Sequence, residues 1–208
     1  MTTRRAFLTT SALWTTGAFC LPALPAWAQH ADLEPEPGVD DMPQRRRWLM
    51  EDTYGNVVKD EDLQGRFVLL YFGYMGCPDV CPTSMSTLAD VMEQLGEVAD
   101  GVTVLFVTVD PDRDTAKRLR EYVQFFDERI VGLRGPKAYT DHMVKAFNAR
   151  YEFHVPDPAK PEDYSVDHTA SIAFIGPDGH LIRRFPHGMA AEEISADVKQ
   201  TIETAIIE

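Results

Sequence analysis

The stretch FVLLYFGYMGCPDVCP, residues 67–82, decides the fold that this chain is predicted to adopt. Its first part, residues 67–74, is a continuous apolar run with the length of a strand buried on both faces. Residues 83–98 follow with apolar side chains at helical spacing, and residues 102–110 (VTVLFVTVD) form a second buried run. A strand, a helix and a strand in this order predict a right-handed crossover that places two parallel strands side by side at the centre of a sheet.

The rest of the chain extends this pattern in both directions. Residues 47–58 (WLMEDTYGNVV within them) predict an N-terminal β-hairpin, and residues 170–185 predict a strand, a Gly-Pro-Asp-Gly turn and a strand. Between them we expect a helix capped by Asp114, a weaker strand at 130–135 and a helix at about 139–151, and a last helix covers 190–207. The predicted fold is α/β: a central mixed sheet with helices on both faces, in the order of a thioredoxin-like domain with an extra N-terminal hairpin and an insertion.

The first 44 residues are expected to lie outside that domain. Residues 1–28 combine Arg4-Arg5, a modestly apolar stretch and a small-residue pattern at Ala26-Trp27-Ala28, which is typical of a twin-arginine export signal. Cleavage after Ala28 is the favoured interpretation, and a retained membrane anchor is the alternative. Residues 29–44 are acidic and carry prolines, which predicts a linker, so the domain is expected to occupy residues 45–208.

Charge and export limit the possible partners. The chain has a formal net charge of −13 and therefore repels a phosphate backbone, so we expect no nucleic-acid partner. The short Arg45-Arg46-Arg47 run is interpreted as a solvated face. An exported protein acts in the periplasm, where an oxidising environment favours a disulfide between neighbouring cysteines unless a reductant or a metal prevents it.

Cys77 and Cys81 directly follow the first central strand, where open α/β sheets place their functional sites. Pro82 is expected to begin the next helix, so that Cys81 lies at its positive end, where the dipole favours the thiolate. A helical turn brings the two thiols to one face, which suits a soft metal ion or a redox-active disulfide. A purely structural disulfide is the third possibility, but so short a loop gains little stability from it.

Two soft ligands do not complete a metal site, and a histidine is the natural third. His168 directly precedes the strand predicted at 170–176, and in a thioredoxin-like layout that loop faces the cysteine loop. Cys77, Cys81 and His168 therefore form a geometrically reasonable trio, although a histidine before a strand is more often structural. Asp167 is a candidate to orient the imidazole, with a solvated loop carboxylate as the commoner alternative.

Three motifs of the sequence resemble those of the SCO (SenC/PrrC-type) family of copper-binding assembly factors for cytochrome c oxidase. They are FGYMGCPDVCP at 72–82, TVDPDRDT at 108–115 and VDHTASIAFIGPDG at 166–179, and the resemblance spans about residues 47–205. It implies that Cys77, Cys81 and His168 bind copper as Cu(I) or Cu(II). Met75 departs from the family, since threonine is usual at that position, and gap filling is its expected role.

The resemblance also implies partners and a process. Copper would be delivered to the dinuclear copper centre of the membrane-bound cytochrome c oxidase subunit II, or the cysteines of that subunit would be reduced beforehand. A thioredoxin-like reductant and another copper donor are further expected partners. Three functions remain open: a copper chaperone, which is favoured, a thiol–disulfide oxidoreductase, and a peroxidase-type or redox-sensor domain, for which a separate resolving cysteine is lacking.

Overall fold

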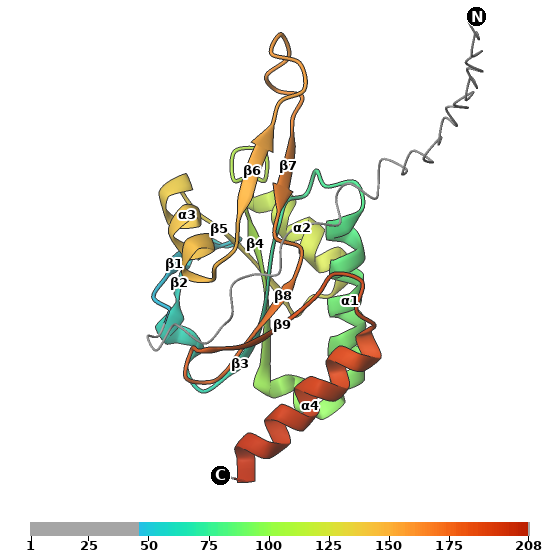
Figure 1. Ribbon diagram of the computed structural model, residues 1–208. Coiled ribbons are helices and arrows are strands. Elements are labelled where there is room, and N and C mark those ends of the chain that lie inside the picture. Colours follow the sequence, from blue (N-terminus) through green and yellow to red (C-terminus); the bar gives the residue numbers. More distant parts are fainter. Residues whose placement is uncertain (1–45, 208) are drawn as a thin grey trace, which may run out of the picture. The chain divides into compact units, whose positions relative to one another are not determined.

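The computed structural model describes residues 46–207, so the expected export signal (1–28) and linker (29–44) lie outside the described residues. The strands and helices of the described part follow one another as β1 (Leu49–Asp52), β2 (Val57–Lys59), β3 (Phe67–Gly73), α1 (Val80–Leu95), β4 (Val102–Thr108), α2 (Ala116–Phe126), β5 (Ile130–Arg134), α3 (Lys137–Ala146), β6 (Tyr151–His154), β7 (Ser165–His168), β8 (Ile172–Ile175), β9 (Leu181–Phe185) and α4 (Ala191–Ile207). Short 3₁₀ turns at Asp60–Leu63 and Gly96–Gly101 precede β3 and β4. Figure 1 shows this order in space.

The larger sheet has the strand order β2-β1-β5-β4-β3-β8-β9, and β6 pairs with β7 in a separate two-stranded sheet. All seven residues of β3 are buried, as its continuous apolar run predicts. β3 pairs in parallel with β4 along its whole length and antiparallel with β8 on its other side, and β4 pairs in parallel with β5. The predicted parallel pair at the centre of the sheet is confirmed.

Helices cover both faces of this sheet. Successive residues of a strand point to opposite faces, and β3 follows this rule. Phe72 packs on Phe147, the residue after α3, whereas Tyr71 packs on Phe106, which in turn packs on Tyr122 of α2. Because α1 contacts both α2 and α4, these three helices lie on one face and α3 lies on the other. The predicted helices on both faces are confirmed.

The two predicted hairpins are present, as β1–β2 and β8–β9, and a third hairpin was not predicted. The helix expected at 139–151 is α3, which ends at Ala146. Asn148 has φ 50°, the left-handed conformation that commonly ends a helix, and Ala149 N–H closes the turn on the Val144 carbonyl. The chain then forms β6 and β7, whose hairpin (residues 151–168, the projecting hairpin) extends away from the larger sheet in Figure 1.

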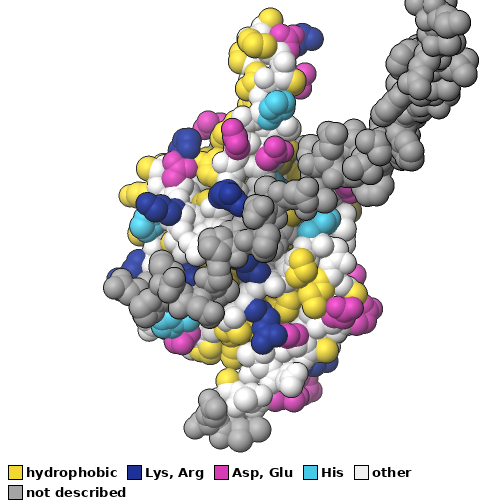
Figure 2. Space-filling view, viewed as in Figure 1, with side chains coloured by type: hydrophobic (Ala, Val, Ile, Leu, Met, Phe, Trp, Pro, Cys, Tyr) yellow, Lys and Arg dark blue, Asp and Glu magenta, His cyan; other side chains and the backbone are white. Residues whose placement is uncertain are grey.

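The charged surface differs from expectation at one point. Arg46, expected to be solvated, is only 5% exposed, because its Nε donates to the Ala146 carbonyl at 2.8 Å and its guanidinium lies over the Phe147 ring. Arg47 is exposed, as expected. Figure 2 shows acidic side chains scattered among basic ones on the face in view. Within residues 46–207 no helix combines the length and the apolar character needed to cross a membrane.

Candidate metal centre

The cysteine loop (residues 74–81) joins β3 to α1 and carries both thiols. α1 begins at Val80 rather than at Pro82, so the predicted start is wrong by two residues. Pro82 is still tolerated because it lies in the first helical turn, where backbone N–H groups have no acceptor within the helix. Cys81 therefore lies in the first turn of α1, at the positive end of the helix dipole.

Gly73 lets the Cys81 side chain pack directly against β3. A Cβ added at this position would lie 3.0 Å from the Cys81 sulfur and equally close to the rings of Tyr71 and Phe106. The absence of a side chain at the end of β3 thus makes room for a thiol that is 0% exposed. Cys77, one turn earlier, is only half-buried. The two sulfurs consequently differ in access: one is inside the core and the other faces the surface.

His168 enters from the opposite side, at the end of β7. Its Nδ1 lies 3.1 Å from the Thr169 carbonyl oxygen, which can only accept, so Nδ1 carries the proton. In a neutral ring the lone pair is then on Nε2, which lies 3.2 Å from the Cys81 sulfur. The imidazole is held edge-on between the rings of Tyr71 and Tyr74, with centroids 5.9 and 6.0 Å away.

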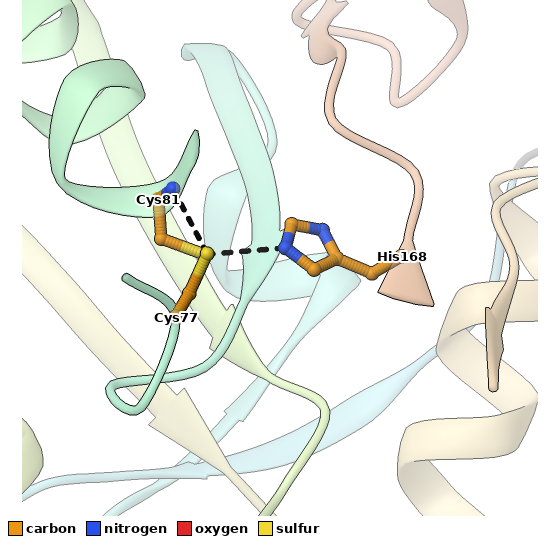
Figure 3. Close-up of side chains that lie close together, drawn as sticks. All are labelled: Cys77, Cys81 and His168. Atoms are coloured by element: carbon orange, nitrogen blue, oxygen red, sulfur yellow. Dashed lines mark hydrogen bonds between the residues drawn. The ribbon is translucent and has the colours of Figure 1, made fainter. Parts of the chain in front are cut away.

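The structure brings the three predicted side chains together (Figure 3). The two sulfurs and an imidazole nitrogen all lie within 4.8 Å of one another, and both cysteines are free thiols. Cys81 N–H also donates to the Cys77 sulfur at 3.4 Å. Two thiol sulfurs and one imidazole nitrogen are a donor set that suits a soft metal ion.

The thiols also differ in acidity. The hydrogen bond with Cys81 is the largest influence that lowers the pKa of Cys77, and a hydrogen bond with His168 adds to it against the opposing effect of burial. The same sulfur–sulfur hydrogen bond and then burial raise the pKa of Cys81. Cys77 is therefore the thiol that is more readily present as a thiolate, which is the nucleophilic and metal-binding form.

The turn between β4 and α2 holds the cysteine loop in place. Asp114 was predicted to cap α2, but the helix begins at Ala116 and its N-cap is Thr115, so this prediction is wrong. The Asp114 carboxylate, 2% exposed, instead accepts the backbone N–H of Met75 at 3.0 Å and the Thr108 hydroxyl at 2.6 Å. Burial raises the pKa of Asp114. Both hydrogen bonds end on Oδ2, so this carboxylate serves the cysteine loop and the end of β4.

The same turn also contacts the strand that carries His168. Arg113 forms an ion pair with the buried Asp110. Its guanidinium lies 3.6 Å from the ring centroid of Tyr164 and donates to the Tyr164 carbonyl at 2.9 Å. The Tyr164 hydroxyl donates to Asp110 at 2.9 Å, and burial followed by this hydrogen bond raises the pKa of Tyr164 to about 12.

Comparison with known proteins matches residues 40–203 to the model of one family, SCO1/SenC. The chain belongs to the SCO1/SenC family. Human "Protein SCO1 homolog, mitochondrial" is 35% identical over 142 residues, which are 67% of this chain and 46% of that protein. The chain spans about half the length of the curated relatives of this kind that it matches.

Solved structures of the family agree with the fold. Bradyrhizobium japonicum ScoI with copper bound is 34% identical, with a TM-score of 0.68 over 75% of this chain and 98% of that chain. Yeast Sco1 with copper bound is 28% identical, with a TM-score of 0.69 over 76% of this chain and 88% of that chain. Together with the mixed sheet and its two helical layers, this likeness confirms the thioredoxin-like fold.

Other candidate residues of this SCO1/SenC protein lie apart from the trio. Asp167 is exposed, and the imidazole is oriented by the Thr169 carbonyl instead. The Met75 side chain is half-buried and packs against the core. The remaining histidines contact other groups or solvent. His142 contacts the Arg47 carbonyl, His180 contacts Asp178, and His187 contacts Ser84. His154 is exposed, and His30 lies outside the described residues.

Sequence reasoning missed the aromatic and hairpin residues that surround the site. Tyr71 and Tyr74 flank the imidazole, yet in the sequence they only extend an apolar strand. Tyr164 precedes β7, where Tyr164 and Val166 alternate with polar residues over too short a run to predict a strand. The sequence offered one signal, the tyrosine hydroxyl in the buried strand. Because a buried hydroxyl usually needs a polar neighbour, Tyr71 indicated that polar groups lie next to β3.

Proposed function

We propose that this protein binds one copper ion through Cys77, Cys81 and His168 and delivers it to the dinuclear copper centre of cytochrome c oxidase subunit II. The observation that carries the proposal is the trio of donor atoms within 4.8 Å, with the Nε2 lone pair directed at the thiols. Copper-bound structures of two relatives, ScoI and yeast Sco1, support it.

The donor set favours Cu(I) as cargo over the commoner zinc. Structural zinc prefers four ligands, whereas soft thiolates select Cu(I), and the described residues offer three donors at this site. His168 adds a harder nitrogen donor that also suits Cu(II). A three-ligand site leaves a coordination position for an incoming thiolate of the partner. Ligand exchange can then transfer the ion without releasing it to water.

Binding is tested by anaerobic titration of the reduced full chain with Cu(I) in competition with a chromophoric chelator. We expect one tightly bound copper, and weaker binding in Cys77→Ala, Cys81→Ala and His168→Ala. His180→Ala is the matched control, because His180 lies in a turn and pairs with Asp178. Wild-type protein that fails to compete with the chelator would overturn the proposal.

Delivery is tested with the metal-free copper domain of subunit II. Loaded protein is mixed with that domain, and the copper content and absorption of the domain are recorded after separation. We expect copper to move to the domain from the wild type. An equal transfer rate from free chelated Cu(I) would show that the protein does not act as the donor.

A thiol–disulfide oxidoreductase that reduces the cysteines of subunit II is the second candidate, and the unequal thiols favour it. The half-exposed Cys77 thiolate attacks the partner disulfide, forming a mixed disulfide and releasing one partner thiolate. Cys81 then attacks the Cys77 sulfur, releasing the second partner thiolate. Two electrons pass to the partner and a Cys77–Cys81 disulfide remains, which a thioredoxin-like reductant must reduce.

The two candidates separate at His168. Metal binding needs its nitrogen, whereas thiol exchange needs only the two sulfurs. We expect His168→Ala to retain exchange with a model disulfide while it loses copper affinity. Loss of exchange in this variant, with copper affinity unchanged, would exclude the ligand set that we propose.

The proposal includes a periplasmic location, with residues 1–28 as an export signal that is either cleaved or retained as an anchor, and 45–208 as the folded domain. Arg4-Arg5 and the small residues before Gln29 support it. Cell fractionation and N-terminal sequencing of the isolated protein test it. A mature chain that begins at Gln29 indicates cleavage, and accumulation of the Arg4→Lys, Arg5→Lys double variant in the cytoplasm indicates twin-arginine export.

A further inference from the structure

The donors of the site come from two segments that are far apart in the sequence. The cysteine loop follows β3, and His168 ends β7, which belongs to the separate two-stranded sheet. Nothing in the backbone pairing of β7 fixes its distance from the cysteine loop, because within the described residues β7 pairs only with β6. Residues 169–171 connect His168 to β8, which pairs with β3, so the chain brings the imidazole near the end of β3. Side-chain contacts at the base of the projecting hairpin then set its position relative to the thiols.

One short turn contacts both segments. On one side, Asp114 accepts the Met75 N–H and so holds the cysteine loop. On the other side, Arg113 and Asp110 hold Tyr164, the residue directly before β7. Residues 110–114, between β4 and α2, therefore contact both the loop that carries the two thiols and the strand that carries the imidazole.

Tyr164 is held in three ways. Its ring stacks on the Arg113 guanidinium, its carbonyl accepts from Arg113 Nη1 at 2.9 Å, and its hydroxyl donates to Asp110 at 2.9 Å. A planar guanidinium is suited to this, since it can stack and donate in its plane at the same time. Asp110 is 1% exposed, so the arginine also balances a buried charge.

The base of the hairpin has further contacts on the β6 side. The Tyr151 hydroxyl donates to Asp141 and accepts from Lys137 Nζ at 2.9 Å, and Thr169 N–H donates to the Arg150 carbonyl.

Beyond these contacts, few side chains of the hairpin are buried. The exposed fraction of Phe153 on β6 is 40%, and on β7 only Val166 is fully buried. Tyr74 also connects the cysteine loop to the hairpin, because its side chain contacts the Val166 backbone and lies next to Arg113. Arg113 is thus in contact with both the hairpin and the aromatic ring that flanks the imidazole.

We propose that Arg113 and Tyr164 are positioning residues for His168, holding β7 against the 110–114 turn so that the imidazole Nε2 faces the Cys81 sulfur. The consequence for copper rests on the proposed function, but the placement of the ring does not. Without these contacts the two thiols remain together and the third donor moves away. The site would then change from three donors to two.

A metal-free measurement tests the placement directly. In the reduced full chain, NOEs between the His168 ring and the rings of Tyr71 and Tyr74 report the edge-on arrangement. We expect these NOEs to disappear in Tyr164→Ala and to weaken in Tyr164→Phe and Arg113→Lys, which keep the charge balance around Asp110. Asp112→Asn is the matched control: Asp112 is exposed in the same turn and should leave the NOEs unchanged.

Copper affinity tests whether the contacts act through the imidazole. Removing groups that orient a metal ligand commonly weakens binding about 10- to 100-fold, and we expect a loss in this range for Tyr164→Ala. In a His168→Ala background the same substitution should have no further effect, because the donor that it positions is already gone. A general loss of structure would weaken binding in both backgrounds.

The outcomes separate the two proposals. Wild-type NOEs in Tyr164→Ala, or an equal loss of copper affinity with and without His168, would overturn the positioning role. If the wild type binds no Cu(I), the proposed function fails and the NOEs alone decide the positioning role. If Tyr164→Ala does not fold, unchanged NOEs in both Tyr164→Phe and Arg113→Lys overturn it.

Discussion

The cysteine loop and the projecting hairpin supply donors to the same site, but they are built in opposite ways. The loop follows β3, which is buried throughout and hydrogen-bonded on both sides. By contrast, β6 is largely exposed, and among residues 46–207 β7 pairs with β6 alone. Two donors therefore lie in a loop that directly follows a core strand, and the third lies on a hairpin whose position, as we propose, depends on side-chain contacts. The proposed delivery of copper would be served by this inequality, because the thiols keep their geometry while one ligand leaves.

Amide exchange should give the largest contrast between the two regions. Amides of central strands such as β3 and β4 commonly exchange only when the whole domain opens, whereas β6 and β7 form a small sheet with exposed side chains. The free energies of local and global opening commonly differ by several kcal/mol. We expect protection factors in β3 to exceed those in β7 by orders of magnitude in hydrogen–deuterium exchange of the metal-free protein. Equal protection would mean that the hairpin is as firmly held as the core.

Replacing the buried thiol should have the next largest effect. Cys81→Ser keeps the shape of the side chain, with a smaller atom in place of sulfur, but removes a soft ligand. We therefore expect Cu(I) affinity to fall by more than the roughly 10- to 100-fold that outer contacts are worth. Chelator competition measures it. Met75→Leu is the control, because it removes a neighbouring sulfur that packs against the core and should leave affinity within a few-fold of wild type. A large loss in Met75→Leu would instead make Met75 part of the site.

The same contrast explains what could be read from the sequence. β3 and β4 were predicted because burial on both faces requires a continuous apolar run, and the loop before β8 was expected at the site because the topology leaves it no other place. The hairpin was missed although YEFH alternates aromatic and polar residues, because a run of four residues shortly after a helix gives only a weak strand signal. Its contact with the β4–α2 turn joins Arg113 and Tyr164, which are 51 residues apart in the sequence.

Asp114 was misread for a related reason. Aspartate before an apolar-periodic segment is a strong sign of an N-cap, and only the tertiary contact with Met75 and Thr108 gives it another role. The start of α1 at Val80 is a boundary error of the same local kind. Local patterns therefore predict elements, and contacts between distant segments decide which side chains serve them.

Packing at the end of β3 offers a smaller test of how rigidly the core holds the thiol. In Gly73→Ala the new methyl group would meet the Cys81 sulfur and two aromatic rings at 3.0 Å, and such overpacking costs about 1–3 kcal/mol. Urea denaturation should show this loss. Gly101→Ala is the control, since no atom lies within 4 Å of its added Cβ. A neutral Gly73→Ala would show that Cys81 can shift, and that the core does not fix the thiols.

The smallest expected effect concerns Asp114, which ties the loop to the β4–α2 turn. Asn keeps an acceptor for the Met75 N–H, so we expect Asp114→Asn to cost no more than about 1 kcal/mol at neutral pH. Because burial raises the pKa of Asp114, the folded protein holds this proton more tightly than the unfolded chain does. The stability that it contributes is complete below the ordinary carboxyl pKa and is lost as the pH rises through the raised one.

The advantage of wild type over Asp114→Asn in free energy of unfolding should therefore be largest in acid, decrease as the pH rises across this window, and become constant above it. Urea denaturation of both proteins at a series of pH values measures the difference. Asp112→Asn, which removes the same charge from an exposed position of the turn, should track the wild type throughout. A wild-type advantage that grows with pH would mean that the ionised carboxylate is the form the loop amide favours, and that the hydrogen bonds to Met75 and Thr108 outweigh burial.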